Sequence, residues 1–436
     1  MSSFNSWPTS NGALTIDTQA VITACRITRP RSKTLRKTIY EVTADGSTKQ
    51  LSPQQEYTLF EEDVYVCTHG HVAVNGPKMA QLYTWEGVSS AKSAAEAAIV
   101  SAKAIARQEG SSLPVQAVSQ GLEPSGFFEA LGGILITRRG AREGAPKQFM
   151  LCGRKHLGHI VFDEVDFDVT LLCSAFVYLI SYPITLQETK HYLWKGSACS
   201  TEEIGAAKLA AMDLSETGEI IEVDQGAEFS SFLKIFGSIT TKTHIRKPTD
   251  MWIQKATAPD KFTARLLRMQ QAEVRQGLFA GMFSRRPSWG SRASPAPPDP
   301  ADVKAEAKEI TPFTQADLDP EGIYLLDAHS MLFVLLGPLF PSLQPETVRN
   351  ALLAQTLLLA SDYAILSASM EDRPVVPKAV VVFSGVPDDI RWLFRHWDDS
   401  QGLWGTGGLM AGSANPAMMN EEKVAPVDEV VRAVCR

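Results

Sequence analysis

The chain has 436 residues, of which 44% are hydrophobic and 21% are charged, and its formal net charge is -7. This composition is typical of a globular protein with two to four domains. The negative charge gives no general attraction to nucleic acid, so no nucleic-acid partner is expected. The six cysteines show no CxxC spacing, which favours reduced thiols in an intracellular, cytoplasmic protein over a disulfide framework or a zinc site.

The two ends and one internal stretch are predicted to lie outside the folded domains. Residues 1–36 are polar, lack the features of a signal peptide, and are interpreted as a flexible N-terminal tail. Residues 284–309 are rich in Pro, Ser, Ala and charge and are interpreted as a disordered insertion or linker. Residues 413–436 are interpreted as a C-terminal tail. No apolar run approaches the ~18 residues needed to span a bilayer, so no transmembrane segment is expected.

In chain order, one pattern of strands then occurs three times. Each copy begins with an apolar strand that contains a tyrosine, and a second strand follows that ends in an aromatic or apolar residue two positions before a glycine. β-branched and aromatic residues favour strands, and the glycine allows a tight turn. The first strands are DVYVCTHGHV from Asp63, AFVYLISY from Ala175 and GIYLLDAHS from Gly322, and the second strands end in LYTWEG, HYLWKG and LFVLLG.

Each turn leads into a long amphipathic helix, which the helical spacing of its apolar residues predicts. A shorter apolar segment then closes the unit: QGLEPSGFFEALGG from Gln120 aligns without a gap with DQGAEFSSFLKIFG from Asp224, and FSGVPDDIRWLFRHWDD is a looser third copy. A period of about a hundred residues is too long for a solenoid and predicts tandem domains. The predicted fold class is α+β, with a central mixed β-sheet flanked by one long and one short helix in each domain.

A unit of this form resembles the gelsolin repeat of the gelsolin, severin and villin proteins. The segments TLFEEDVYVC and GHIVFDEVDFDVTLLCSAFVYLIS resemble in particular the divergent gelsolin-repeat proteins of fungi, and ITPFTQADLDPEGIYLLD and WLFRHWDD are similar to the third unit's counterparts in the family. The resemblance covers residues 40–412. It implies three gelsolin-like repeats, at residues 37–143, 147–258 and 259–412.

The resemblance implies a protein of the cytoplasm and actin cytoskeleton that binds actin monomers and filaments, caps barbed ends and in some members severs filaments. In the family, one long helix enters the cleft of an actin subunit. The candidate contact residues here are Ala95, Ile99, Ala102 and Ile105, on the long helix of repeat 1. Packing against the domain's own sheet is the alternative for each of them. A gelsolin-like interaction scaffold that does not bind actin, as in vesicle coats, is the alternative for the whole chain.

The resemblance also implies candidate calcium sites, each made from a backbone carbonyl, an aspartate that opens the core strand and a glutamate early in the long helix. Repeat 1 keeps Asp63, with Glu62 at the position of the carbonyl donor, but has Ala94 in the helix. Calcium takes six to eight oxygen ligands, so the loss of one carboxylate weakens a site steeply.

The other two repeats are also incomplete. Repeat 2 keeps Glu203 but has Phe176 at the aspartate position, and repeat 3 has Gly322 there and Gln344 or Glu346 in the helix. Calcium binding is therefore expected to be weak or absent, and no other cofactor is expected. Glu203 has an alternative role, since STEE at residues 200–203 is a capping box.

The basic residues Arg29, Arg31, Lys33, Arg36 and Lys37 are candidates for binding phosphoinositide headgroups, as relatives in the family often do. Each basic residue near an anionic lipid surface adds about 1 kcal/mol of attraction. The alternative is a solvated basic tail.

Cys67, His69 and His71 alternate along one strand and form the most metal-like cluster, with a structural strand as the alternative. The sequence contains no P-loop, no GxGxxG after a strand, no GxSxG and no HExxH. No enzymatic activity is therefore expected.

Overall fold

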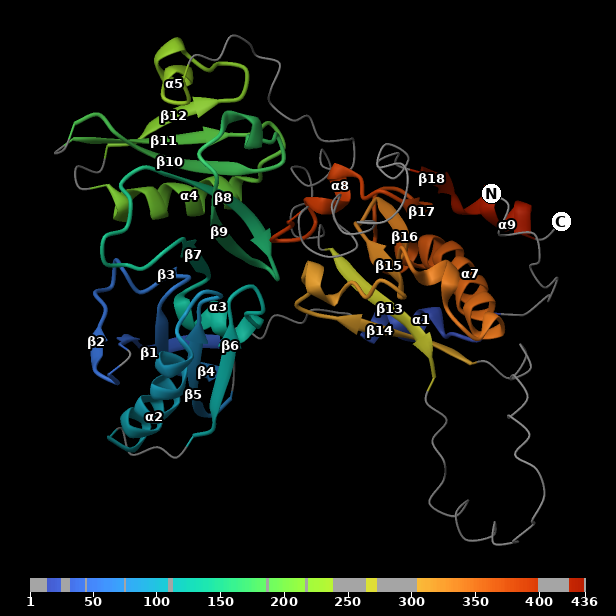
Figure 1. Ribbon diagram of the computed structural model, residues 1–436, viewed down its shortest axis with the longest axis horizontal. Coiled ribbons are helices and arrows are strands. Elements are labelled where there is room, and N and C mark those ends of the chain that lie inside the picture. The colour runs from blue at the N-terminus through green and yellow to red at the C-terminus, as the bar shows by residue number, and fades with distance from the viewer. Residues whose placement is uncertain are drawn as a thin grey trace, which may run out of the picture. The chain divides into compact units, whose positions relative to one another are not determined.

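The structure is a computed structural model that describes residues 14–24, 32–43, 45–73, 76–108, 113–185, 188–215, 219–237, 264–272, 304–398 and 423–434. The chain divides into two compact units. One unit is Ile27–Thr263, and the other combines Met1–Arg26 with Ala264–Arg436. The described residues form three mixed sheets with helices on their faces, which confirms the α+β class (Figure 1).

The first sheet lies in unit Ile27–Thr263 and has the strand order β2-β1-β4-β5-β6. Its neighbouring strands are antiparallel except β5 and β6, which are parallel. Val64, Val66 and Leu82 face α2, whereas Tyr65 and Cys67 face α3 on the opposite side, as strand alternation requires. The elements are β1 (Ser32–Val42), β2 (Thr48–Gln50), β4 (Val64–Ala73), β5 (Lys78–Glu86), α2 (Lys92–Gln108), β6 (Val115–Ser119) and α3 (Ser125–Leu131).

The second sheet, in the same unit, has the order β12-β11-β10-β8-β9-β7-β3. Helix α4 covers the face with Leu151, Leu179 and Leu193, and Phe232 of α5 contacts Tyr192 from the other face. The elements are β3 (Thr58–Phe60), β7 (Ile134–Arg138), β8 (Phe149–His156), β9 (His159–Val165), the 3-10 turn Val169–Leu171, β10 (Val177–Pro183), β11 (Thr189–Lys195), α4 (Thr201–Leu214), β12 (Ile221–Asp224) and α5 (Ser230–Lys234).

Two strands of the second sheet come from the sequence assigned to repeat 1. Strand β3 pairs in parallel with β7, and β7 pairs in parallel with β9 of repeat 2. The hydroxyl of Tyr57, just before β3, also donates a hydrogen bond to Asp213 on α4. Because repeat 1 supplies two strands to the sheet of repeat 2, the two repeats share one sheet and form one unit.

The third sheet lies in the other unit and has the order β14-β13-β15-β16-β17-β18, with β16 and β17 parallel. The long helix α7 covers one face, where its leucines meet Leu325, Leu332 and Val334. The elements are α1 (Thr18–Ala24), β13 (Arg265–Gln271), β14 (Ala305–Ile310), β15 (Ile323–Asp327), β16 (Met331–Leu336), α7 (Glu346–Met370), β17 (Lys378–Ser384), α8 (Asp388–Arg391), β18 (Lys423–Pro426), α9 (Val427–Val434) and the 3-10 turns Gln315–Asp317 and Phe340–Ser342.

Helix α7 is long and apolar enough to cross a membrane by length and composition, since an 18-residue window has a mean hydropathy of 1.4. In the structure, 56% of that window is buried within the protein. Contacts with the third sheet, α1 and α9 account for the apolar composition of this helix.

The structure corrects three expectations about segments outside the domains. The expected tail 1–36 contains α1, whose Ile22 is fully buried, and the start of β1. The expected tail 413–436 contains β18 and α9, which pack on β17 and α7. The end of the expected linker 284–309 is part of β14, and residues 284–303 lie outside the described residues. In each case an apolar side chain packs against buried residues that are distant in sequence. Local composition does not predict such a contact.

Candidate functional site

Three strand-to-helix joints position the three long helices. At each joint a glycine approaches an upstream carbonyl oxygen so closely that a Cβ atom would lie 2.1 Å from it at Gly87 and Gly337, and 2.4 Å from it at Gly196. The glycine N–H also donates to the carbonyl of the residue at or next to the start of the core strand, with distances of 3.1, 3.2 and 2.9 Å for Gly87, Gly196 and Gly337. Close backbone approach therefore requires glycine at this repeated position.

A hydrogen-bonded clasp joins the second strand to the closing segment in repeats 1 and 2. In repeat 1 the Nε1–H of Trp85 donates to Oε1 of Glu123 at 2.9 Å, and both oxygens of Glu123 accept from the N–H of Gly121 at 3.1 Å. Trp194 and Glu228 repeat this contact at 3.0 Å. The two donor glycines have φ of 85° and 87°, in the left-handed region. The Trp, Glu and Gly shared by the two copies thus act together.

The tyrosine of the core strand has one role in all three repeats. The hydroxyls of Tyr65, Tyr178 and Tyr324 each form a hydrogen bond with the backbone of the segment that precedes their strand. Burial raises the pKa of each phenol, so each hydroxyl is protonated at neutral pH. Repeat 3 keeps this tyrosine and the joint glycine, but Leu335 stands where repeats 1 and 2 have tryptophan.

The outer face of α2 exposes the neighbouring aliphatic side chains of Ile99 and Val100. Ala95 is half-buried on the same helix. Ala102 and Ile105 are buried in the core that α2 forms with the first sheet. The prediction that these two residues contact actin is therefore wrong, because positions three and four apart on α2 form its sheet-facing side.

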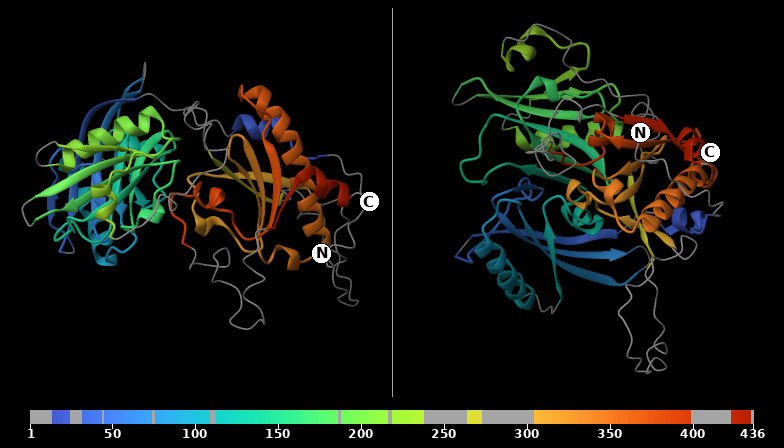
Figure 2. Two further views of the ribbon diagram at one scale, coloured as in Figure 1. Left: turned by 90° about the horizontal axis from the view of Figure 1, so that it is seen from above. Right: turned by 45° about the vertical axis from the view of Figure 1, so that its right-hand side comes forward.

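The outer face of α4 exposes Leu209 and Met212, whose relative exposures are 60% and 59%. Helix α4 lies against the second sheet (Figure 2), and alanines on the side that faces the sheet pack in its core. Sequence reasoning missed these two residues. A signal was present, since both fall outside the stripe of Ile204, Ala207 and Ala211 and are apolar without a core to cover.

In repeat 1, the candidate calcium ligand Asp63 already has partners. Its Oδ2 accepts from the hydroxyl of Tyr65 at 3.0 Å and from the backbone N–H of Arg142 at 2.9 Å. The Arg142 guanidinium lies nearby, with its Nε 3.0 Å from a carboxylate oxygen of Glu41. The side chain of Glu62 is exposed to solvent, and Ala94 is buried among apolar side chains. The structure therefore brings no second carboxylate from α2 to Asp63.

In repeat 2, Glu203 forms the capping box that the sequence offered as its alternative role. Its Oε2 accepts from the N–H of Ser200 at 2.9 Å, and its Oε1 accepts from the N–H of Lys155 at 2.9 Å. The side chain is fully buried. At the aspartate position, the ring of Phe176 lies 4.5 Å from the guanidinium carbon of Arg154. A cation bound here would face the carboxylate of Glu203, which already accepts hydrogen bonds, and the positively charged guanidinium of Arg154.

The described residues of repeat 3 and of the histidine strand add no cation site. Glu346, at the helix position of repeat 3, forms an ion pair with Arg349 at 2.8 Å. The rings of His69 and His71 stack 4.7 Å apart, and burial lowers the pKa of His69 to about 4 and raises that of Cys67 to about 12. Among the described residues, no three His, Cys, Asp or Glu side chains are arranged to hold a metal ion.

The candidate phosphoinositide residues differ in their exposure and in their contacts. Lys33 and Arg36 are exposed on β1. Lys37 points away, because its Nζ forms an ion pair with Glu56 at 2.9 Å and donates to the carbonyl of Leu131. Arg29 and Arg31 lie outside the described residues.

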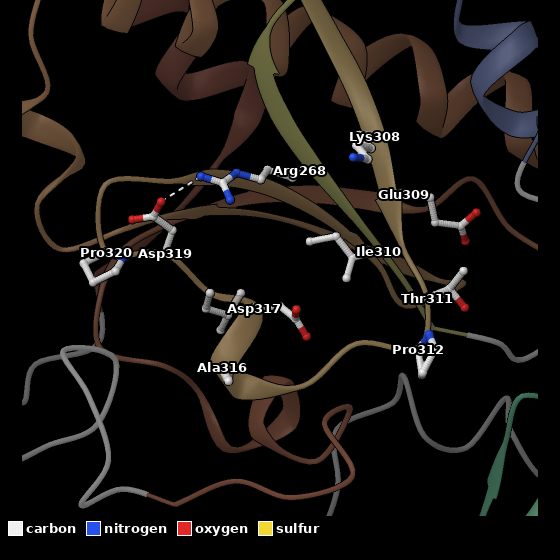
Figure 3. A pocket seen from close by; sticks show the side chains of 11 residues that line it. Arg268, Lys308, Glu309, Ile310, Thr311, Pro312, Ala316, Asp317, Asp319 and Pro320 are labelled. Atoms are coloured by element: carbon white, nitrogen blue, oxygen red, sulfur yellow. Dashed lines mark hydrogen bonds and ion pairs between the residues drawn. The ribbon is translucent and has the colours of Figure 1, made fainter. Parts of the chain in front are cut away.

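A groove of about 700 Å³ lies beside the third sheet, between β13, β14 and the segment that follows β14 (Figure 3). Arg268 and Lys308 line one side, and Asp317 and Asp319 line the other. Arg268 and Asp319 form an ion pair across it at 2.7 Å. Because opposite charges face each other, the groove presents no surface of a single charge to a ligand.

The fold and the joints define the class of this protein: tandem α+β domains in which a glycine joint connects the strand after the core strand to a long covering helix. A family model described as the gelsolin repeat matches residues 158–233, which include the second joint. A model described as a domain of unknown function matches residues 38–139. Residues 158–233 are thus similar to a gelsolin repeat, which confirms the resemblance to the gelsolin and villin proteins seen in the sequence.

Curated relatives agree with this assignment. The chain is 24% identical to advillin of Mus musculus over 343 residues, covering 77% of this chain and 35% of that protein. It is 28% identical to gelsolin of Drosophila melanogaster over 336 residues (77% and 36%), and 24% identical to protovillin of Dictyostelium discoideum over 302 residues (65% and 27%). The chain spans about a third of the length of these relatives.

Among solved structures, the chain is similar to one titled as the crystal structure of the Thorarchaeota 2DGel3/rabbit actin complex. The sequence identity is 16%, the match covers 46% of this chain and 99% of that chain, and the TM-score is 0.19. The similarity to the gelsolin and villin proteins therefore depends on the sequence matches.

Proposed function

We propose that this protein binds actin, as monomer and filament, through the outer faces of α2 and α4. The observation that carries the proposal is the exposure of two aliphatic pairs, Ile99 with Val100 and Leu209 with Met212, on the long helices of gelsolin-like domains. Large apolar side chains that are exposed on a regular element are typical anchors of protein interfaces. Ala95 beside Ile99 leaves room for close approach of a partner.

The shared second sheet supports this proposal. Since β3 and β7 of repeat 1 complete the sheet of repeat 2, α2 and α4 belong to one unit. Contact residues held on a preformed scaffold lose less conformational freedom on binding than residues on separate domains. Each exposed pair is therefore held on a preformed scaffold.

The finer activity that we propose is barbed-end capping, with severing as a second outcome, under weak or no calcium control. Weak calcium control is expected because the remaining carboxylates already accept hydrogen bonds. Asp63 accepts from Tyr65 and Arg142, and Glu203 accepts from two backbone N–H groups. A calcium ion would have to displace these donors without gaining the further oxygen ligands it requires.

The test is seeded elongation of actin from free barbed ends with the full chain and two variants. Leu209→Asp combined with Met212→Asp is expected to lower the apparent affinity for barbed ends at least tenfold, because it places two charges in the proposed contact. Val376→Asp is the matched control, since Val376 is 58% exposed but lies in the other unit. Equal inhibition by all three proteins, or none by the unaltered chain, would refute actin binding through α4.

Calcium control is tested by the same assay in calcium and in chelator. We expect inhibition curves that differ by less than threefold. A tenfold shift between the two conditions would show that a functional calcium site exists and that the reading of Asp63 and Glu203 is incorrect.

We also propose that Lys33 and Arg36 contact anionic phosphoinositide headgroups. Their support is exposure on one stretch of β1, where each adds about 1 kcal/mol of attraction to an anionic surface. Flotation with vesicles containing phosphatidylinositol bisphosphate tests this against neutral vesicles. The Lys33→Glu, Arg36→Glu variant should lose binding, whereas Lys49→Glu on exposed β2 should retain it. Equal flotation of both variants would contradict the assignment.

The alternative function is a gelsolin-like interaction scaffold that does not bind actin. Leu335 in place of the joint tryptophan, which marks repeat 3 as divergent, favours this alternative. Elongation assays separate the two, because a scaffold leaves barbed-end growth untouched. With actin as its partner, we place the protein in the cytoplasmic actin cytoskeleton, acting by binding and not as an enzyme.

A further inference from the structure

Helix α7 differs from its counterparts α2 and α4 in what covers it. One side of α7 packs on the third sheet, and beside that side lies Gln355, a polar residue that is also buried. The N-terminal helix α1 lies beside α7 in both views (Figures 1 and 2). One flank of α7, beside its sheet-facing side, is therefore covered by another segment of the same chain.

The contact between α1 and α7 combines two polar anchors with one apolar anchor. The Oε1 of Gln355 accepts from the backbone N–H of Thr15 at 2.9 Å and from its hydroxyl at 3.1 Å. The hydroxyl of Thr18 donates to Oδ2 of Asp362 at 2.5 Å. Ile22 is fully buried and joins the apolar core of the third unit. Since Gln355 and Asp362 are seven residues apart, they lie on one face of α7, about two turns from each other.

Helix α1 is short and far in sequence from the rest of this unit. Helix α1 has seven residues, too few to be stable without its contacts. Its remaining contacts are the partly buried Leu14, Ile16 and Val21. The rest of the unit begins at Ala264, beyond the whole of the other unit. By contrast, α9, which also touches α7, follows directly from β18, a strand paired with β17.

We propose that this face of α7 is a helix-binding surface and that α1 is its displaceable resident. The occupant it fits is a short amphipathic helix with a hydroxyl side chain and an aliphatic side chain four residues later, as Thr18 and Ile22 of α1 have. A second hydroxyl residue, which corresponds to Thr15, lies in the segment that leads into that helix. While α1 is seated, the surface is closed to any other helix. When α1 leaves, Gln355 and Asp362 face solvent together with the apolar site of Ile22.

Displacement follows from a population argument. A tethered segment and its surface exchange between a seated and an open state, and a competing helix binds only the open fraction. A change that weakens the seated state without touching α7 therefore strengthens the apparent affinity for a competitor. The proposal concerns α7 and does not depend on actin binding by α2 and α4.

The test uses the full chain and a fluorescent peptide of residues 14–24 as the probe, followed by fluorescence anisotropy. The Ile22→Asp variant should release its own α1 and bind the peptide at least tenfold more tightly than the unaltered chain. Gln19→Asp is the matched control, because Gln19 is exposed on the same helix. It should bind the peptide no better than the unaltered chain. A folded Ile22→Asp variant that gains no affinity overturns the proposal.

A second measurement applies even where Ile22→Asp fails to fold. Amide hydrogen exchange of the unaltered chain should show α1 exchanging at least a hundredfold faster than β15 and β16, because α1 opens without unfolding the third sheet. Exchange of α1 at the same rate as these strands would mean that it opens only with the whole unit, and would overturn the proposal. Neither readout involves actin, so failure of the actin-binding proposal leaves this result interpretable.

Discussion

Replacing Glu123 by Ala should destabilise repeat 1 far more than the same change at Glu228 destabilises repeat 2. Glu123 is fully buried, and its removal leaves the indole N–H of Trp85 and the N–H of Gly121 without their acceptor. Each buried donor left unsatisfied costs about 1–3 kcal/mol, so the expected loss is about 3 kcal/mol. Glu228 makes the same contacts but is partly exposed, so water can replace it and the loss should be about 1 kcal/mol.

The assay is urea unfolding of the full chain with hydrogen exchange read separately on β4 and on β10, because several domains need not unfold as one two-state system. Glu123→Gln is the rescue variant, since its amide oxygen keeps one acceptor, and it should recover more than half of the loss. Equal losses at the two glutamates, or a loss below about 1 kcal/mol at Glu123, would refute the claim that burial of the clasp sets its contribution.

Three further changes follow from the structure. Gly87→Ala should prevent stable folding of repeat 1, because its Cβ would overlap a carbonyl oxygen, whereas Gly205→Ala on α4 meets open space and should raise the melting temperature slightly; thermal unfolding compares them. Asp327→Ala should cost about 3 kcal/mol in urea unfolding, because it removes the fully buried carboxylate of this ion pair and leaves the buried guanidinium of Arg373 only the partly exposed Glu371. Arg373 holds the pKa of Asp327 below its usual value against the effect of burial. A loss under about 1 kcal/mol would contradict this. The pKa of His69 is lowered from 6.5 to about 4, chiefly by burial and also by His71, so the unfolded chain takes up a proton first as the pH falls. The melting temperature should therefore fall between pH 6.5 and 4, and His69→Gln should flatten that dependence; an unchanged slope would show that other groups cause it.

Local pattern was sufficient for much of the fold. The strands around Tyr65, Tyr178 and Tyr324 and the helices that follow Gly87, Gly196 and Gly337 lie where the periodicity predicts, because these signals act over a few neighbouring residues. The capping role of Glu203 could be proposed for the same reason, since a capping box spans four residues.

The candidate site was less predictable. Ala102 and Ile105 share a stripe with Ile99 in the sequence, and a wide apolar stripe does not say which of its edges faces the sheet. The sequence places Leu209 and Met212 outside the apolar stripe of α4, but only the packing of the alanine side on the second sheet shows that both are exposed. Likewise, the hydrogen bond from the N–H of Arg142 to Asp63 joins residues that are 79 positions apart.

The sequence by itself determined the repeated unit, its strands and long helices, the glycine joints and the resemblance to the gelsolin repeat, because each of these depends on the order of residues within a short stretch. Only the tertiary structure decided that β3 and β7 complete the sheet of the next repeat, that α1 covers α7, and which helix faces remain open. These features depend on which distant surfaces meet and on how much apolar area each meeting buries, and no local pattern encodes that choice.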